Sequence, residues 1–170
     1  YQVYFLMDRL GYSHADIPAI MFKLNLITSG VQILSSLLSG WLSDVLKRRK
    51  VFIWTSAVLY GLGLLVVSNS NSYDRFLVGA CIMSFSFGVY FAVDMALVTE
   101  VLPDKQNNAA KDLGILNVAG ALPQTLAPAM APLFLFAQGH ATPNYNMLFA
   151  VAAVFAVLGA VTIIPVKKVR

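Results

Sequence analysis

The chain has 170 residues, of which 58% are hydrophobic and only 12% are charged. Soluble domains are typically about 45–50% apolar and about 25% charged, whereas this chain has a mean hydropathy of +0.72. A soluble domain of this length could not bury so much apolar surface. The composition therefore indicates a membrane protein and excludes a disordered chain, a coiled coil and a disulfide-rich secreted domain. The single cysteine, Cys81, can form no internal disulfide and no metal site, so neither a cofactor nor a metal is expected.

Stretches without Asp, Glu, Lys or Arg divide the chain into membrane-spanning segments. Each segment approaches or exceeds the roughly 18–20 apolar residues that cross a ~30 Å hydrocarbon core. The segments do not alternate polar and apolar residues, as the strands of an outer-membrane barrel would. The sequence predicts transmembrane helices at about 18–44, 51–69, 74–101, 109–137 and 145–166.

The chain opens on Tyr1 within an apolar run and without an initiator Met. Residues 1–7 are therefore expected to be the tail of a truncated first helix, and the five complete spans are the second to the sixth. All of 1–170 is expected to form one helical membrane domain.

The basic residues predict the orientation. If the spans alternate in direction, nine of the twelve lie on one side of the membrane, within 47–50, 105–111 and 167–170. The positive-inside rule assigns that side, and the C-terminus, to the cytoplasm. We therefore expect a multi-pass protein of the cytoplasmic (plasma) membrane. The net charge of +4 is explained by this topology, so no nucleic acid is expected as a partner.

The second helix carries a polar stripe at three- and four-residue steps, which places it on one helix face. Lipid offers these groups no hydrogen-bond partners, so the face should meet protein or a water-filled cavity. Small hydroxyl residues also join membrane helices to one another, which suits the serines, whereas the bulkier amides favour a cavity. The stripe consists of Asn25, Thr28, Ser29, Gln32, Ser35, Ser36 and Ser39.

The fifth helix repeats this pattern. Asn117 and Gln124 lie seven residues apart and therefore share a face. Three prolines in the same helix remove backbone donors and make it bendable; they are Pro123, Pro128 and Pro132. The third and sixth helices carry few polar residues and are expected to face lipid.

The loop between the second and third helices reads Gly40-Trp-Leu-Ser-Asp44-Val-Leu-Lys47-Arg48-Arg49-Lys50. It resembles the signature of the major facilitator superfamily, Gly-x-x-x-Asp-(Arg/Lys)-x-Gly-Arg-(Arg/Lys)-(Arg/Lys), which occurs between the second and third helices of each half. Val45 and Lys47 depart from the family's cation and glycine. Glu100-Val-Leu-Pro103 is also similar to the Glu-x-x-Pro-x-x-x-Arg element of sugar porters, with Asn107 in place of the arginine.

The resemblance covers essentially the whole chain. It implies an all-α membrane fold, the C-terminal six-helix bundle of a major facilitator superfamily transporter with the first helix truncated. It also implies alternating access, in which two six-helix halves rock about a solute site near the midplane. The expected partners are membrane lipid, the missing N-terminal six-helix half of the same chain and a small polar solute.

The resemblance further implies a charge cluster at the cytoplasmic ends that latches one conformation. Asp44 would lie against the N-terminus of the fifth helix, where the helix dipole favours a carboxylate by about 0.3–1 kcal/mol, and Arg48 or Arg49 would reach Glu100. The alternative is a set of solvated loop charges, each pair contributing about 0–1 kcal/mol. The residues assigned to the latch are Gly40, Asp44, Arg48, Arg49, Glu100 and Lys111.

Amide side chains both donate and accept hydrogen bonds, as a hydroxyl-rich solute requires. An aromatic ring would supply a face for a sugar, with plain packing as the alternative. The candidate solute-binding residues are Asn25, Gln32, Tyr90, Asn117 and Gln124.

Asp94 is the one carboxylate set well inside a span, roughly 9 Å deeper along the helix than Glu100. A carboxylate near the bilayer centre costs about 2.5–3.5 kcal/mol and is a functional candidate by default. Apolar neighbours favour its protonated form, so we assign proton coupling to Asp94. The alternative is an ion pair with Lys111 or with a cation of the missing half.

These features favour a secondary active transporter that moves a small polar solute, with a sugar as the first candidate, by proton-coupled alternating access. An enzyme is not expected, because the chain has no metal-binding or nucleophilic motif, and His14 and His140 fall in predicted outer loops. The remaining alternative is a membrane scaffold or accessory domain that does not transport.

Overall fold

The computed structural model describes residues 1–101, 109–136 and 143–162, and all of their side chains except 97–101, 109–110, 112–113 and 116. Every regular element within these residues is an α-helix. The helices are α1 (Gln2–Asp8), α2 (Ile17–Leu46), α3 (Arg49–Ser68), α4 (Tyr73–Val101), α5 (Ala109–Leu135) and α6 (Tyr145–Thr162).

Five of these helices, α2 to α6, are long and apolar enough to cross a membrane. Their observed bounds lie within two residues of the predicted ones, apart from the end of the sixth helix, which falls outside the described residues. The all-α membrane fold predicted from the sequence is therefore confirmed.

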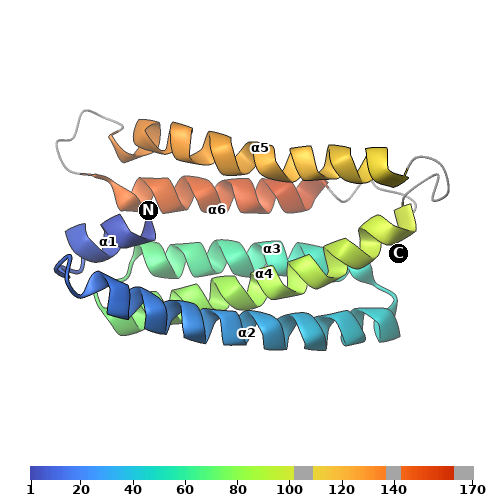
Figure 1. Ribbon diagram of the computed structural model, residues 1–170, viewed down its shortest axis with the longest axis horizontal. Helices are drawn as coiled ribbons and strands as arrows, with labels where there is room; N and C mark the ends of the chain where they lie inside the picture. Colours follow the sequence, from blue (N-terminus) through green and yellow to red (C-terminus); the bar gives the residue numbers. More distant parts are fainter. Residues whose placement is uncertain (102–108, 137–142, 163–170) are drawn as a thin grey trace.

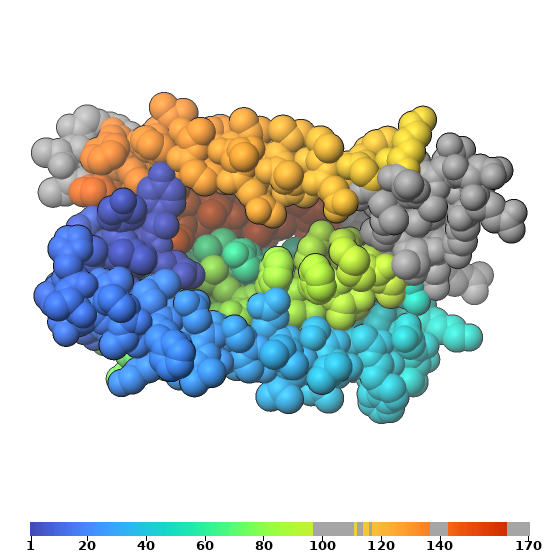
Figure 2. All heavy atoms as spheres, viewed as in Figure 1, coloured from blue at the N-terminus to red at the C-terminus, as the bar shows by residue number. Residues whose placement is uncertain are grey.

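The helices form an open arc. Among the described residues α2 packs on α4, α4 on α3, α3 on α6 and α6 on α5, so α2 and α5 are the two ends of the arc (Figure 1). Figure 2 shows a hollow between these two helices, with parts of the inner helices visible inside it. The short α1 lies at one end of this hollow.

Close backbone packing of α4 on its two neighbours holds the arc together. A Cβ atom on Gly63 of α3 would lie 3.2 Å from the Gly79 carbonyl oxygen, and one on Gly79 would lie 3.1 Å from the Gly63 carbonyl oxygen. On the other side of α4, a Cβ atom on Gly88 would lie 2.5 Å from the Gln32 carbonyl oxygen of α2. Helices approach so closely only where one of them has no side chain.

Two serines of the polar stripe lie in the packed part of α2. Ser35 and Ser39 are buried, and their hydroxyls donate within α2, to the carbonyl oxygens of Gln32 at 2.9 Å and of Ser36 at 3.3 Å. This half of the stripe therefore serves helix packing, with its polar groups satisfied by its own helix.

An aromatic cluster fixes α1 against the first turns of α4 and α6. The buried ring of Phe5 stacks on Phe76, with centroids 5.6 Å apart, and meets Tyr145 and Phe149 edge-on at 5.4 and 5.6 Å. The Tyr145 hydroxyl donates a hydrogen bond to the Asp8 carboxylate. Each aromatic pair contributes about 0.5–1.5 kcal/mol beyond its buried area, so these contacts hold α1 in place against α4 and α6.

The residue that ends α2 has a left-handed backbone. Lys47 has φ 50° and ψ 32°, a conformation that costs an L-residue with a side chain roughly 1–2 kcal/mol. Lys47 occupies the position at which the signature prefers glycine, and glycine adopts this backbone angle without a steric penalty. The turn forms here despite the lysine.

Replacing Gly88 by alanine is expected to destabilise the protein, because the new methyl group would collide with the Ser35 hydroxyl and with the Gln32 carbonyl oxygen of the α2 backbone, which cannot move aside cheaply. Such overpacking typically costs about 1–3 kcal/mol. Gly30→Ala is the matched control, since nothing lies within 4 Å of its added Cβ atom. Thermal unfolding of purified full-length variants measures the difference, and equal stability of the two variants would contradict the packing described.

Candidate solute site

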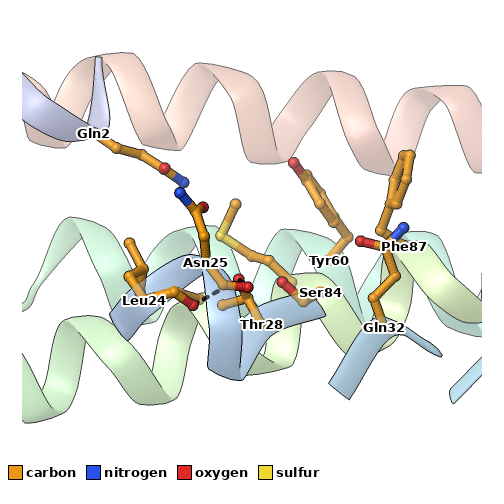
Figure 3. Close-up of a pocket in the computed structure, with 10 residues that line it drawn as sticks. Gln2, Leu24, Asn25, Thr28, Gln32, Tyr60, Ser84 and Phe87 are labelled. Atoms are coloured by element: carbon orange, nitrogen blue, oxygen red, sulfur yellow. Dashed lines mark hydrogen bonds between the residues drawn. The ribbon is translucent and has the colours of Figure 1, made fainter. Parts of the chain in front are cut away.

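A polar groove lies where α1, α2, α3 and α4 meet. It has a volume of about 230 Å³, and no charged side chain lines it. Figure 3 shows the amides of Gln2 and Asn25 pointing toward each other, while Gln32, Tyr60 and Phe87 project to a common side. The lining residues are Gln2, Leu24, Asn25, Thr28, Gln32, Tyr60, Ala80, Met83, Ser84 and Phe87.

Helical spacing on α2 explains why its polar residues line one groove. Asn25, Thr28 and Gln32 follow one another at steps of three and four residues and therefore share a face. The Thr28 hydroxyl donates to the Leu24 carbonyl oxygen at 2.8 Å. The side-chain amides of Asn25 and Gln32 make no hydrogen bond within the described part of the chain, so both can bind a ligand.

Several lining residues were not assigned from the sequence, among them Gln2, Tyr60, Ser84 and Phe87. Tyr60 comes from α3, a helix expected to face only lipid, yet its half-buried side chain reaches the groove. Phe87 and Ser84 come from α4. The sequence could have indicated Ser84, because it precedes Gly88 by one helical turn and therefore shares the α4 face that meets α2.

Tyr90 lies beside this groove but does not line it. It belongs to a second groove of about 280 Å³ between α3, α4 and α6, which shares Tyr60 and Phe87 with the first. Two buried serines of the second groove, Ser56 and Ser86, donate to carbonyl oxygens of their own helices at 2.8 and 2.7 Å. The amide-rich surface therefore belongs to the first groove.

The amides of α5 stand apart from both grooves. Asn117 and Gln124 are exposed, and neither lines the first or the second groove. Their helix forms the rim of the hollow opposite α2 (Figure 2). The structure therefore brings together Asn25 and Gln32, whereas a solute site shared with Asn117 and Gln124 stays a prediction.

One hydrogen bond ties α5 to Tyr1, the residue directly before α1. Pro132 has no N–H, so the Pro128 carbonyl oxygen lacks the donor that residue 132 supplies in a regular helix. The Tyr1 hydroxyl donates to this oxygen at 3.1 Å. A side chain of a neighbouring helix thus satisfies the freed carbonyl, as membrane helices containing proline require.

At the opposite end of the bundle, Asp44 pairs with the nearby Arg49. The guanidinium donates to the carboxylate at 3.2 Å, and the Asp44 side chain is 68% exposed, so the pair contributes about 0–1 kcal/mol. Arg48 and Lys111 are exposed, while the side chain of Glu100 lies outside the described residues. The contacts of the latch with the fifth helix and with Glu100 stay predictions.

Asp94 is half-buried in α4. The described residues include both this carboxylate and Lys111, and no ion pair joins them. One of the two structural alternatives to proton coupling is therefore absent in this conformation, while a cation from another part of the protein is still an alternative.

A double-mutant cycle is expected to reveal the bond between α1 and α5. Tyr1→Phe leaves the Pro128 carbonyl oxygen without a donor and should destabilise the protein by about 0.5–1.5 kcal/mol. Pro132→Ala restores a donor within α5, so Tyr1→Phe should cost less in that background. Unfolding free energies of the four full-length proteins give the coupling, and purely additive effects would contradict the bond.

Comparison with known proteins identifies the family. The family model of the Major Facilitator Superfamily matches residues 2–170. The chain is 29% identical over 119 residues to a Bacillus subtilis (strain 168) protein, "Uncharacterized MFS-type transporter YfiU"; the match covers 70% of this chain and 22% of that protein. The chain thus matches about a fifth of this relative's length, and no solved structure matches it. The chain belongs to the Major Facilitator Superfamily of membrane transporters.

Proposed function

We propose that this chain forms one wall of the solute path in a secondary active transporter, and that the solute is small, polar and uncharged. The polar groove carries the proposal. It presents three amides without hydrogen-bond partners among the described residues, those of Gln2, Asn25 and Gln32, together with a hydroxyl from Ser84 and the ring of Phe87. These groups donate and accept hydrogen bonds without a formal charge, so a sugar or a glycoside is the first candidate.

The size of the groove fits one side of a binding site. Its volume of about 230 Å³ lies below the ~300–1,000 Å³ usual for small-molecule sites. The remaining walls would come from the opposite rim of the hollow and from the other six-helix half of the full-length protein. On the opposite rim, Asn117 and Gln124 are the groups of α5 suited to the same solute.

Movement of α5 is the proposed contribution of this half to alternating access. The helix contains Pro123, Pro128 and Pro132, and each proline removes one backbone hydrogen bond that would resist bending. Bending toward α2 would bring the α5 amides nearer to Asn25 and Gln32. The Tyr1–Pro128 bond would serve as the pivot.

We infer the orientation from charge. The end of the bundle that carries 47–50 holds four consecutive cations, and the positive-inside rule assigns this end to the cytoplasm of the plasma membrane. The end with α1 then faces outward. Asp44 and Arg49 would sit at the cytoplasmic mouth, where making and breaking such pairs can accompany opening and closing.

A scaffold or accessory domain without transport activity is the competing function. It would leave the unpartnered amides of the groove without a role, although lipid exposure or a dry cavity would penalise each of them. Uptake measurements decide between the two functions.

Alanine at Asn25 or Gln32 is expected to raise the KM for the transported solute. Each change removes a hydrogen bond worth about 0.5–1.5 kcal/mol, which corresponds to a roughly two- to tenfold weaker interaction. Uptake of labelled sugars by full-length protein in proteoliposomes measures the effect. Asn146→Ala is the control, because this exposed amide of α6 lies outside both grooves.

If the two variants and the control share one KM while uptake persists, the solute site lies elsewhere in the transporter. If wild-type protein takes up no solute from a panel of sugars and other polar compounds, the scaffold becomes the better account.

We further propose that Asp94 couples transport to protons, and Asp94→Asn tests this role. The amide keeps the size of the side chain and removes its titration, so accumulation driven by a proton gradient should be abolished while exchange of solute across the membrane continues. Asp16→Asn is the control, since this exposed carboxylate lies before α2 and accepts a hydrogen bond from Ser13 at 2.7 Å. Unimpaired accumulation by Asp94→Asn would mean that protons are coupled elsewhere or not at all.

A further inference from the structure

An apolar groove of about 760 Å³ runs along the contact between α3 and α4, separate from the two grooves described above. Five aliphatic side chains line most of its length, and three polar side chains line one end. The aliphatic residues are Leu62, Leu65, Val66, Val78 and Ile82, and the polar ones are Asn69, Asp74 and Arg75.

The polar end lies where α3 finishes and α4 begins. Asp74 and Arg75 stand in the first turn of α4, and both are exposed. The backbone N–H of Arg75 donates to the Ser72 hydroxyl at 3.4 Å, which supports this turn. Neither charge forms an ion pair within the described part of the chain, so a carboxylate and a guanidinium both border this end of the groove and are available to a ligand.

We propose that this groove binds a phospholipid with an ethanolamine head group. The acyl chain lies between α3 and α4, the phosphate contacts Arg75 and the ammonium contacts Asp74. A guanidinium offers several N–H donors in a fork that matches phosphate oxygens. A primary ammonium brings N–H donors to a carboxylate in the manner of a lysine.

The length of the groove fits one leaflet. Arg75 and Ile82 are seven residues apart, which is about 10 Å along a helix. One leaflet supplies about 15 Å of the ~30 Å hydrocarbon core, so the aliphatic walls cover most of the depth that an acyl chain occupies. The charged pair then sits at the level of the head groups.

The chemistry of the groove favours this occupant over others. A transmembrane protein segment would need shape complementarity along its full length, whereas an acyl chain adapts to an open, aliphatic surface. The mouth carries one positive and one negative charge and therefore has no net attraction for an anionic lipid. A choline head group has no N–H to donate to Asp74, so the structure predicts a preference for ethanolamine.

The test uses full-length protein in detergent, titrated with phosphatidylethanolamine, phosphatidylcholine or phosphatidylglycerol of identical acyl chains and followed by native mass spectrometry. We expect the ethanolamine lipid to bind about tenfold more tightly than the choline lipid, the effect of a charge-assisted hydrogen bond. Asp74→Asn should remove this preference, and Arg75→Gln should weaken both lipids.

Two further variants separate the proposal from a general change in the protein. Arg9→Gln is the matched control, because it removes an exposed cation that lies outside the groove, and it should leave the lipid preference intact. Val78→Trp should reduce binding of every lipid, since Val78 is 56% exposed and the indole would fill the groove without entering the core.

Equal affinity for the ethanolamine and choline lipids, or an unchanged preference in Asp74→Asn, would overturn the proposal. So would tighter binding of the glycerol lipid that Arg75→Gln abolishes, because it would indicate a site for anionic lipids. A second copy of the chain held through this groove, seen as a dimer that Val78→Trp dissociates, would overturn it as well.

Discussion

The close approach of α4 to α2 and α3 is the contact on which the rest of the structure depends. Gly88 brings the α4 backbone against the Gln32 carbonyl oxygen, and Gly63 and Gly79 do the same between α3 and α4. Because lipid gives no hydrophobic drive for helices to associate, such contacts rely on close van der Waals packing. The arc therefore depends on small residues at a few crossing points.

The polar groove is built directly on these crossings. Gln32 contributes its carbonyl oxygen to the contact with Gly88, while its side-chain amide lines the groove. Phe87 directly precedes Gly88, and Ser84 lies one helical turn before Gly88. The glycine that sets the spacing between α2 and α4 therefore also places these two side chains at the groove. A shift of α4 would therefore change both the helix packing and the shape of the groove that we propose binds the solute.

The hollow stays open because α5 meets the rest of the arc mainly through α6. Its prolines free backbone carbonyls, and the Tyr1 hydroxyl satisfies one of these from α1. Phe5 and Tyr145 hold α1 in turn against α4 and α6. The part of α5 around Pro128 is thus tied to the structure through the segment that begins with Tyr1.

Periodicity and composition determined the class of this protein. Uncharged stretches of sufficient length define the five spans because a bilayer tolerates few charges, and the observed helices follow those stretches closely. The loop signature identified the family from its glycine, aspartate and cations, since local turn chemistry can be read without tertiary structure. Side-chain size also separated two groups of the α2 stripe: Ser35 and Ser39 are buried, while the larger amides Asn25 and Gln32 line the groove.

Tertiary structure alone decided which helices meet. Helical spacing defines the face on which Asn25 and Gln32 lie but does not select their neighbours, so the contributions of Gln2, Tyr60 and Phe87 to the groove could not be derived from it. The same limit applies to Asn117 and Gln124, whose shared face on α5 does not fix their distance from α2. The Tyr1–Pro128 bond joins residues 127 positions apart, and only the packing of α1 by its aromatic cluster makes that bond possible.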